Sequence, residues 1–533
     1  MPFQPDEFSS LSQPFLDAVS DDKTAAQHDA PAAAAAWVPM LSHGCTFGPD
    51  IFTRVMMNLI RNPNINSAWL FRADILHDDG EEGVRTLNHV DQPIIHHRQL
   101  GNMTRRRTLV RRLVPRSEKR DKPLNQTCSF YSSTASGKGS LRTARCVVYL
   151  PHASVDELPF YHPPVDGIAH HHDWDPAAGR GTISVHFLVA QPEQARQDPK
   201  LRRISFHMLQ VLHRHGEGTA SGYTKRVQHD VVVPQARFQD RYAALKTKHA
   251  RRLVNSWVES TDPAKHVFED LAIAAFLIEL WADMYADGTF PGFVDIGCGN
   301  GLLVHLLTQE GYPGWGFDAR ARKSWASYCH QSSLSSSLPS ASSSSPSCSS
   351  PSPSSSSSSP SSSPLLLQEK LLLPDLARQI TRDTTIDDNA CMSVHNGVFP
   401  PGTFIISNHA DELTPWTPIL GHISQCPFVM IPCCSHNLAG ARFRAPAPKD
   451  KTKSSSTYSS LVDWVARIAQ DCGWVTETEM LRIPSTRNTC ILGRTRASNH
   501  VDVDVATVVA KYGGADGFCD NVVKLLKTGP RTH

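Results

Sequence analysis

Residues 293–303 read Phe293-Val-Asp-Ile-Gly-Cys-Gly-Asn-Gly-Leu-Leu303. The first four residues form a short apolar run, which predicts a buried strand. Glycines end this run, and leucines at helical spacing within residues 302–307 predict that a helix follows. Gly297, Gly299 and Gly301 would allow a tight turn and a close approach of a ligand to the backbone. The stretch therefore predicts the strand, ligand-binding turn and helix of an α/β fold.

Two acids near this turn indicate which ligand it binds. A dinucleotide fingerprint has its last glycine one position later, where this chain has Leu302. Asp295 ends the strand, and a carboxylate there suits an ammonium group, as in S-adenosylmethionine, better than a pyrophosphate. A second predicted strand, residues 314–317, ends in Asp318, about 20 residues after Gly297, as a ribose-binding acid does in nucleotide folds. We interpret this as a methyltransferase domain; the alternative is a tight turn without a ligand.

Composition limits the remaining possibilities. A chain of 533 residues favours two or three domains, and its net charge of +2 means that local basic patches would have to contact any polyanion. The thirteen cysteines include no CxxC pair and only the adjacent Cys433 and Cys434, so we predict no metal site and a reducing compartment. The polar, acidic N-terminus argues against a secretory or mitochondrial signal. The most apolar helix candidate, residues 271–281, is too short to span a membrane.

The predicted domain organisation follows from shifts in composition. Residues 1–36 are rich in Asp, Ser and Ala, and we interpret them as a disordered tail. Residues 37–240 are assigned to an N-terminal α+β domain that binds RNA or another substrate. The methyltransferase domain comprises residues 241–331 and 365–533. The Ser/Pro-rich residues 332–364 between these parts cannot bury a core, and we predict a disordered insertion there.

Apolar patterns predict strands in the N-terminal half. Residues 141–150, 182–190 and 205–213 alternate or run apolar, which is typical of an antiparallel sheet. Between the first two lie three consecutive histidines, residues 170–172. Three consecutive side chains cannot all point to one metal on a regular element, so a surface loop is favoured over a metal site.

Two basic segments are candidates for contact with phosphates. Residues 103–122 contain nine Lys or Arg residues against Glu118 and Asp121, and this density could neutralise several phosphates. A solvated surface is the equally weighted alternative. Residues 223–259 are also basic, with aromatic residues interleaved, and residues 239–258 are predicted to form a helix whose basic face is the second candidate.

The C-terminal half continues the pattern of alternating strands and helices. Residues 365–380 have helical periodicity, and the third strand is expected between residues 380 and 394. A clear strand at residues 403–407 precedes Asn408, and another at residues 428–432 precedes Cys433. Residues that follow the carboxyl ends of strands line the ligand crevice of an open α/β sheet.

Several strings resemble one known family, the tRNA (uracil-O(2)-)-methyltransferase family. Besides the glycine stretch, they are Tyr223-Thr-Lys-Arg-Val-Gln-His-Asp230, Trp257-Val-Glu-Ser-Thr-Asp-Pro263, Lys265-His-Val-Phe-Glu-Asp270, Asn408-His-Ala-Asp-Glu-Leu-Thr-Pro-Trp416 and Ile431-Pro-Cys-Cys-Ser-His436. The resemblance covers residues 161–494 apart from the serine tract. It implies a class I, Rossmann-like methyltransferase domain beside the N-terminal α+β domain. It also implies a cytoplasmic enzyme that uses S-adenosylmethionine to methylate the ribose 2′-hydroxyl of uridine 44 in serine tRNA.

The expected site residues follow from the motifs and this resemblance. In methyltransferases of this fold the residue after the fourth strand faces the methyl group, which implies such a role for Asn408. Asp411 is the candidate for accepting or steering the hydroxyl proton, and Glu412 lies beside it in the sequence. The alternative, which has nearly equal weight, is that these two acids only cap the helix that follows. The expected cofactor-binding residues are Asp295, Gly297, Gly299, Asn300, Gly301, Asp318 and Asn408.

Two other functions stay open on the sequence alone. One is a methyltransferase of the same fold that acts on a protein or a small molecule. The other is a non-catalytic RNA-binding module with a decayed cofactor pocket, against which the intact acids and glycines argue. The expected partner is tRNA, serine tRNA above all, with no membrane; the sequence does not indicate the oligomeric state.

Overall fold

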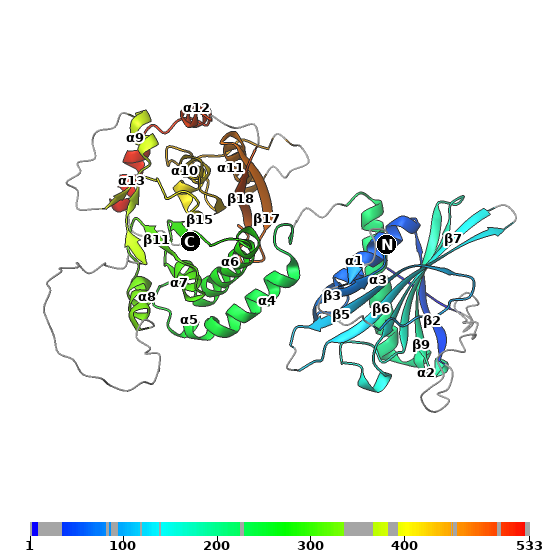
Figure 1. Ribbon diagram of the computed structural model, residues 1–533. Helices are drawn as coiled ribbons and strands as arrows, with labels where there is room; N and C mark the ends of the chain where they lie inside the picture. Colours follow the sequence, from blue (N-terminus) through cyan, green and yellow to red (C-terminus); the bar gives the residue numbers. More distant parts are fainter. Residues whose placement is uncertain are drawn as a thin grey trace, which may run out of the picture. The chain divides into compact units, whose positions relative to one another are not determined.

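The chain forms two compact units, residues 1–226 and 227–533, which are described separately (Figure 1). The predicted boundary after residue 240 falls inside α4 (Gln235–Leu245), which packs against α6 (Pro263–Met284) of the second unit. Arg237 and Arg241 of α4 both form ion pairs with Glu279 of α6. The computed structural model describes residues 3–8, 35–80, 85–86, 94–117, 120–137, 140–223, 229–334, 366–381, 393–448, 450, 456–497 and 503–527.

A nine-stranded antiparallel sheet dominates the described part of the N-terminal unit, in the order β1-β2-β9-β8-β7-β6-β5-β3-β4. β7 and β9 confirm the strands predicted at residues 141–150 and 182–190. The strands are β1 (Asp6–Glu7), β2 (Ala36–Cys45), β3 (Leu70–Asp78), β4 (Arg85–Thr86), β5 (Thr104–Pro115), β6 (Leu124–Gly137), β7 (Ser140–Pro151), β8 (Gly167–Asp175) and β9 (Arg180–Val189).

Helices pack on this sheet around one apolar core. Phe52 of α1 and Leu212 of α3 lie in the same buried cluster as Phe187 of β9. The strand predicted at residues 205–213 is wrong, because these residues belong to α3, where the buried positions recur at helical spacing. A short apolar run alone does not distinguish a strand from a helix. The helices are α1 (Pro49–Arg61), η1 (Pro63–Ile65), η2 (Val155–Glu157), α2 (Pro192–Gln197) and α3 (Pro199–Ala220).

Two further predictions for this unit need correction. Within the predicted tail, Asp6 and Glu7 form β1, which pairs with β2. The histidines at residues 170–172 do not form a surface loop: they lie in β8, between β7 and β9, and all three are buried. Successive side chains of a strand point to opposite faces, so these rings do not converge on one site.

The second unit contains a seven-stranded mixed sheet in the order β12-β11-β10-β15-β16-β18-β17, and a separate parallel pair, β13 and β14. The first five strands in this order, β12, β11, β10, β15 and β16, are parallel to one another. β18 runs antiparallel to both of its neighbours, β16 and β17. The strands are β10 (Phe293–Ile296), β11 (Gly314–Asp318), β12 (Leu367–Glu369), β13 (Leu371–Leu372), β14 (Val394–His395), β15 (Phe404–Asn408), β16 (Phe428–Ile431), β17 (Trp474–Met480) and β18 (Thr489–Arg496).

Helices cover both faces of the mixed sheet. Phe293 of β10 belongs to an apolar cluster with residues of α4, α6 and α7, whereas its neighbour Val294 belongs to a cluster with residues of α10, α11 and α13. This alternation explains why the strand is apolar throughout, since both of its faces are buried. The remaining elements are η3 (Lys246–Ala250), α5 (Arg251–Asn255), α7 (Leu302–Gln309), α8 (Lys323–Leu334), α9 (Asp375–Thr381), η4 (Asp411–Trp416), α10 (Thr417–Ser424), α11 (Thr457–Asp471), α12 (Val505–Lys511) and α13 (Phe518–Lys527).

The region around the serine tract differs from the prediction. Residues 365–380 were expected to be helical, but they contain β12 and β13 before α9 begins. The third strand is therefore β12, which pairs with β11, and not a segment between residues 380 and 394. Residues 332–334 end α8, whereas residues 335–365 and residues 224–228 of the Tyr223 string lie outside the described part. Among the described helices, none is long and apolar enough to cross a membrane.

Candidate active site

The glycine turn connects β10 to α7 as expected. The backbone N–H groups of Gly297 and Cys298 both donate to the carbonyl oxygen of Phe317 on β11, at 2.9 and 3.0 Å. Gly299 has a φ of 54° and faces open space, because a Cβ added there would meet no atom within 4 Å. A Cβ on Gly301 would instead lie 2.6 Å from the Leu367 side chain. Gly299 is thus open to a ligand, whereas Gly301 allows β12 to pack closely.

A cavity of about 690 Å³ lies at the carboxyl ends of β10, β11 and β15. This volume is in the range of small-molecule sites. Gly301 is the one expected cofactor residue that is absent from the cavity lining, in agreement with its packing against Leu367. The expected residues that line the cavity are Asp295, Gly297, Gly299, Asn300, Asp318, Asn408, Asp411 and Glu412.

Buried acids make the cavity suited to a cation. Asp295 is only 1% exposed, and its Oδ1 atom is buried without a hydrogen-bond partner. Burial, together with the charges of Asp270 and Asp318, raises the pKa of Asp295 far above its usual range. Burial and the neighbouring Glu269 raise the pKa of Asp270 to about 8. A bound ammonium group would relieve this repulsion, so the acids fit S-adenosylmethionine.

The side chains of Asp318 and Asn300 accept hydrogen bonds from the backbone in and near the glycine turn. The Asp318 carboxylate accepts hydrogen bonds from the N–H groups of Gly299, at 3.0 Å, and Arg320, at 3.2 Å. The Asn300 Oδ1 atom accepts one from the Leu302 N–H at 2.8 Å, at the start of α7. Both side chains hold the backbone around the cavity, and the predicted contact of Asp318 with a ribose stays a prediction.

Two residues of the loop after β15, one of them the expected base Asp411, have a strained backbone conformation. His409 and Asp411 have positive φ values, 54° and 45°, which non-glycine residues adopt only where their surroundings enforce them. The His409 Nε2 atom lies 3.2 Å from a carboxylate oxygen of Glu269 on α6. Asn408 ends β15, and its Oδ1 atom is buried without a hydrogen-bond partner. The loop is thus fixed against α6, with the Asn408 amide at the cavity.

Asp411 and Glu412 lie in the first turn of η4, whose N-cap position is occupied by Ala410. The Cys433 thiol donates a hydrogen bond of 3.1 Å to Asp411 Oδ1. The pKa of Cys433 is raised by its hydrogen bond with Cys434, by burial and by the Asp411 charge, so the thiol keeps its proton. The ligand atoms of Asp411, Cys433 and Cys434 lie within 4.8 Å of one another, where they could hold a metal ion. The absence of a metal site stays a prediction.

Several residues of this cavity had no predicted role. Glu269 and Asp270 project from α6, although both belong to a string that carried the family resemblance. The available signal was two adjacent acids beside the apolar run of residues 271–278 on this helix, because a buried acid in such a place commonly serves a site. Lys370 and Arg487 also line the cavity, but neither lies in a motif that would have identified it.

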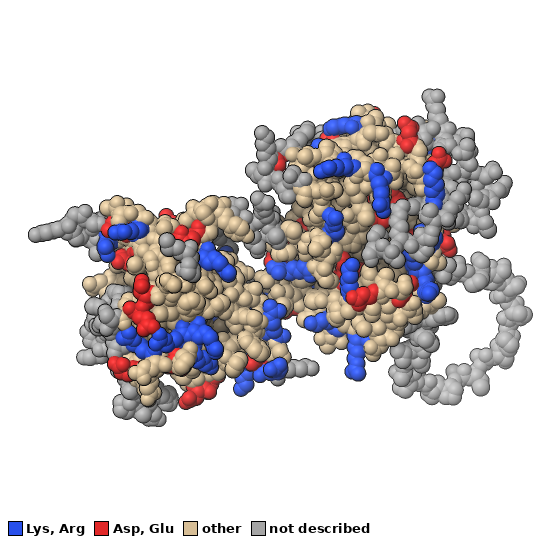
Figure 2. Space-filling view, turned by 180° about the vertical axis from the view of Figure 1, so that it is seen from behind, with Lys and Arg blue, Asp and Glu red and all other residues tan. Residues whose placement is uncertain are grey.

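The two basic segments are less available for RNA than their composition indicated. In the first, Arg107 pairs with Asp78 and Arg111 is buried, although Arg105, Arg106 and Arg112 are exposed. In the second, the ion pairs with Glu279 engage Arg237 and Arg241, and Lys248 pairs with Glu310. Figure 2 shows Lys and Arg side chains gathered on one part of the visible face of the N-terminal unit, with acidic side chains beside them.

The mixed sheet, the glycine turn and the acidic cavity define an S-adenosylmethionine-dependent methyltransferase. A family model described as "Predicted AdoMet-dependent methyltransferase" matches residues 232–337, and one described as "TRM44-like, N-terminal bet v1-like domain" matches residues 12–226. The chain belongs to the tRNA (uracil-O(2)-)-methyltransferase family, because it resembles proteins of that name along nearly its whole length.

Three relatives illustrate the similarity. A tRNA (uracil-O(2)-)-methyltransferase from Neurospora crassa is 52% identical over 502 residues, which cover 92% of this chain and 93% of that protein. The proteins of the same name from Debaryomyces hansenii and Saccharomyces cerevisiae are 38% and 36% identical, and the alignments cover 93% and 92% of this chain and 96% and 92% of those proteins. The family membership and the cofactor expected from the sequence are therefore confirmed.

Proposed function

We propose that this enzyme methylates the ribose 2′-hydroxyl of uridine 44 in serine tRNA, in the cytoplasm. The relatives are named tRNA (uracil-O(2)-)-methyltransferases, which supports tRNA as the substrate; the ribose 2′-hydroxyl as the acceptor rests on the family resemblance. The choice of serine tRNA, of position 44 and of the compartment rests on the family resemblance. We also propose that the second unit has the class I, Rossmann-like arrangement, which the strand order and the antiparallel β18 support.

The cofactor would be held by the residues around the glycine turn. Asp295 is placed to pair with the ammonium group, because its carboxyl is buried near Asp270 and its Oδ1 atom lacks a hydrogen-bond partner. Gly299 leaves room for a ligand against the backbone, Gly297 lines the cavity beside it, and Asp318 lies where a ribose would be expected. Asn408 would face the reactive methyl group. S-adenosylmethionine supplies a strongly electrophilic methyl group, so positioning of the acceptor contributes much of the rate.

The 2′-hydroxyl is a weak nucleophile that benefits from a base. We assign this role to Asp411, whose carboxylate is held by Cys433 and whose backbone is fixed by the strained loop. Asp411 would accept or steer the proton as the oxygen attacks, and Glu412, buried beside it, would keep the local charge negative. A general base of this kind typically contributes about 10²- to 10⁴-fold to the rate.

One observation supports this function above the others. Asp295 of β10 precedes Asn408 at the end of β15 and Asp411 at the start of η4 by more than 100 residues, yet all three line one cavity. The test is methyl transfer from labelled S-adenosylmethionine to an unmodified serine tRNA transcript and to a matched transcript with 2′-deoxyuridine at position 44. We expect label in the first RNA alone. Equal labelling of both, or labelling of protein alone, would contradict the proposal.

A further inference from the structure

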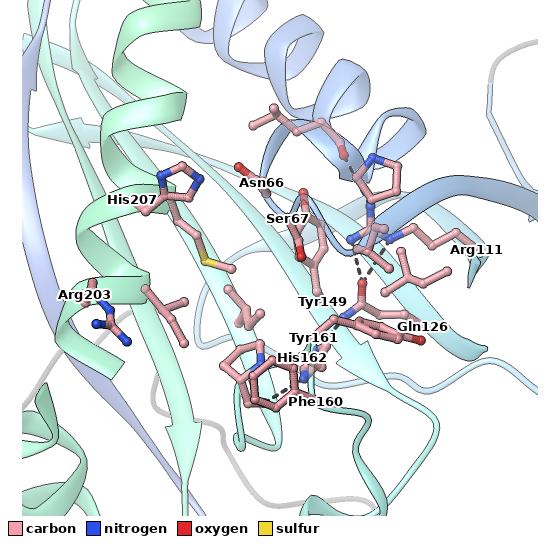
Figure 3. A pocket seen from close by; sticks show the side chains of 18 residues that line it. Asn66, Ser67, Arg111, Gln126, Tyr149, Phe160, Tyr161, His162, Arg203 and His207 are labelled. Carbon is pink, nitrogen blue, oxygen red and sulfur yellow. Dashed lines mark hydrogen bonds between the residues drawn. The ribbon is translucent and has the colours of Figure 1, made fainter. Parts of the chain in front are cut away.

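The N-terminal unit contains a cavity of about 420 Å³ that the methyltransferase reaction does not explain. It lies between α3 on one side and β5, β6 and β7 on the other, as Figure 3 shows. Its lining includes no Asp, Glu or Lys residue. The polar side chains that line it are those of Asn66, Ser67, Arg111, Gln126, Tyr149, Tyr161, His162, Arg203 and His207.

A buried cation lies at the floor of this cavity. Arg111 is 5% exposed and donates hydrogen bonds to Gln126 Oε1, at 2.7 and 3.0 Å, and to the carbonyl oxygen of Ile60, at 2.8 Å. Its guanidinium also stacks over the ring of Tyr149, 4.7 Å from the ring centre. All these partners are neutral. A buried cation without an opposite charge is destabilising, so its presence points to an electron-rich ligand group.

The neighbouring polar groups are held in fixed orientations. The Nδ1 atom of His162 contacts the carbonyl oxygen of Pro163 at 2.7 Å, and its Nε2 atom lies 3.0 Å from Gln126 Nε2. Burial lowers the pKa of His162 to about 4, so the ring is neutral and accepts from the Gln126 amide. The Tyr149 hydroxyl and Asn66 Oδ1 are buried without a hydrogen-bond partner. The cavity thus offers hydrogen bonds that the chain itself does not use.

Two exposed aromatic rings, each with a cation near its face, lie at this cavity: one lines it and the other contacts the first. Phe160, which lines the cavity, is 68% exposed and contacts Trp69, which is 46% exposed, edge to face at 5.6 Å. The Lys200 ammonium lies 5.6 Å from the centre of the Phe160 ring, and Arg120 lies 5.9 Å from that of Trp69. Proteins that bind single-stranded RNA use exposed aromatic rings to stack on unpaired bases and nearby cations to contact the adjoining phosphates.

We propose that this cavity binds one unstacked nucleotide of the RNA substrate, other than the nucleotide that is methylated. The base enters beside Phe160, and a carbonyl oxygen on its edge accepts a hydrogen bond from Arg111. The flanking phosphates lie against Lys200, Arg203 and Arg120. Uracil has two such carbonyl oxygens and adenine has none, so the cavity prefers uridine over adenosine. This inference rests on the proposed function in taking the RNA to be tRNA.

Binding of short RNA to the full-length protein tests the cavity without the reaction. Fluorescence anisotropy should show that hexauridylate binds more tightly than hexaadenylate. Phe160→Ala should weaken hexauridylate binding about tenfold, since stacking contributes at this level. Ile94→Ala, which shortens a side chain that is 73% exposed in the same unit and outside the cavity lining, is the control and should have no effect. Equal binding of both RNAs by the wild type, or unchanged binding by Phe160→Ala, would overturn the proposal.

The contribution of Arg111 requires a second variant and a check of folding. Arg111→Met should bind hexauridylate and hexaadenylate equally while keeping the affinity for S-adenosylmethionine. Since this variant removes partners of Gln126 and Ile60, cross-linking of the wild-type protein to a tRNA containing 4-thiouridine gives an independent result. A cross-link in the peptide that contains Phe160 and Tyr161 supports the proposal, and cross-links confined to other peptides overturn it. Dodecanoate is the probe for a small organic acid. If the protein binds dodecanoate in this cavity but does not bind hexauridylate, the cavity would be assigned to a small organic acid and the proposal would be overturned.

Kinetics separates failure of this inference from failure of the proposed function. With tRNA as substrate, Phe160→Ala should raise KM about tenfold and leave kcat unchanged. An unchanged KM, with normal methylation of tRNA, would reject the cavity and leave the proposed function intact. Specific binding of hexauridylate without any methylation of tRNA would support the cavity and reject the proposed function.

Discussion

The Sγ atom of Cys433 donates a hydrogen bond of 3.1 Å to Oδ1 of Asp411 and thereby joins the loop after β16 to the loop after β15. Asp411 has a φ of 45°, a conformation that a non-glycine residue keeps only where contacts such as this one hold it. The pair places a carboxylate of η4 and a protonated thiol in the lining of the cavity.

Substitution of Asp411 tests its assignment as the base. Asp411→Asn keeps the shape of the side chain but cannot accept a proton, so kcat should fall about 100-fold or more. The affinity for S-adenosylmethionine, measured by calorimetry, should stay the same. Glu412→Gln is the matched control and should lower kcat far less. A kcat of Asp411→Asn near that of the wild type would show that another group, or water, takes the proton.

Removal of the Asp295 carboxyl tests the cofactor site. Asp295→Ala should abolish binding of S-adenosylmethionine, because the group proposed to pair with its ammonium is lost. The free protein should remain folded or gain stability, since the substitution removes a buried acid whose Oδ1 atom has no hydrogen-bond partner. Asp287→Ala, at an exposed position after α6, serves as the control. Calorimetric affinities that match in Asp295→Ala and the wild type would remove Asp295 from the site.

The raised pKa of Asp270 predicts how stability depends on pH. The folded protein holds the Asp270 proton up to a pKa of about 8, whereas the unfolded chain releases it near its ordinary value of 3.8. Stability from this group is therefore complete below pH 3.8 and is lost as the pH rises to about 8. The loss is at most about 1.4 kcal/mol per pH unit.

Thermal unfolding without cofactor checks this prediction. Between pH 5 and pH 8 the melting temperature of the wild type should fall more than that of Asp270→Asn, which has no carboxyl to titrate. Asp287→Asn, at the exposed control position, should behave like the wild type. If Asp270→Asn and the wild type lose the same stability over this range, Asp270 titrates normally in the folded protein.

The serine tract should be dispensable. It joins α8 to β12, and β12 is held in the sheet by its pairing with β11. Replacing residues 337–363 with a short Gly/Ser linker changes the cost of closing the loop only slightly. We expect the cofactor affinity and kcat to match those of the full chain. A loss of folded protein, or of activity with the cofactor affinity retained, would give the tract a structural or substrate-binding role.

The parts of the site that could be predicted from the sequence are those whose residues are contiguous in the chain. The strand, turn and helix around Asp295 are contiguous in the chain, so the sequence pattern alone was sufficient to predict them. Glu269 and Asp270 reach the same cavity only because α6 packs across the sheet, which no local pattern encodes. The loop after β15 was identified as a strand end, but its strain and the contact with Cys433 depend on a segment about 20 residues away.

Longer-range packing also explains the errors. The histidines at residues 170–172 lie in β8, a central strand between β7 and β9, and packing on the faces of the sheet buries them, as where His172 stacks on Phe47 and on Phe52 of α1. From the sequence, Arg111 was counted among the basic residues available to RNA. On β5, however, its side chain is buried and lines the cavity of the N-terminal unit, whereas the next residue, Arg112, is exposed. β12 is only three residues long, too short for its apolar pattern to be distinguished from that of a helix.

The most direct test of the central claim is to locate the transferred methyl group. Unmodified serine tRNA is incubated with the protein and labelled S-adenosylmethionine, then digested to nucleosides and fragments for mass spectrometry. The account predicts 2′-O-methyluridine at position 44, with none formed by Asp295→Ala. A methyl group on a base, at another nucleotide, or only on protein would contradict it.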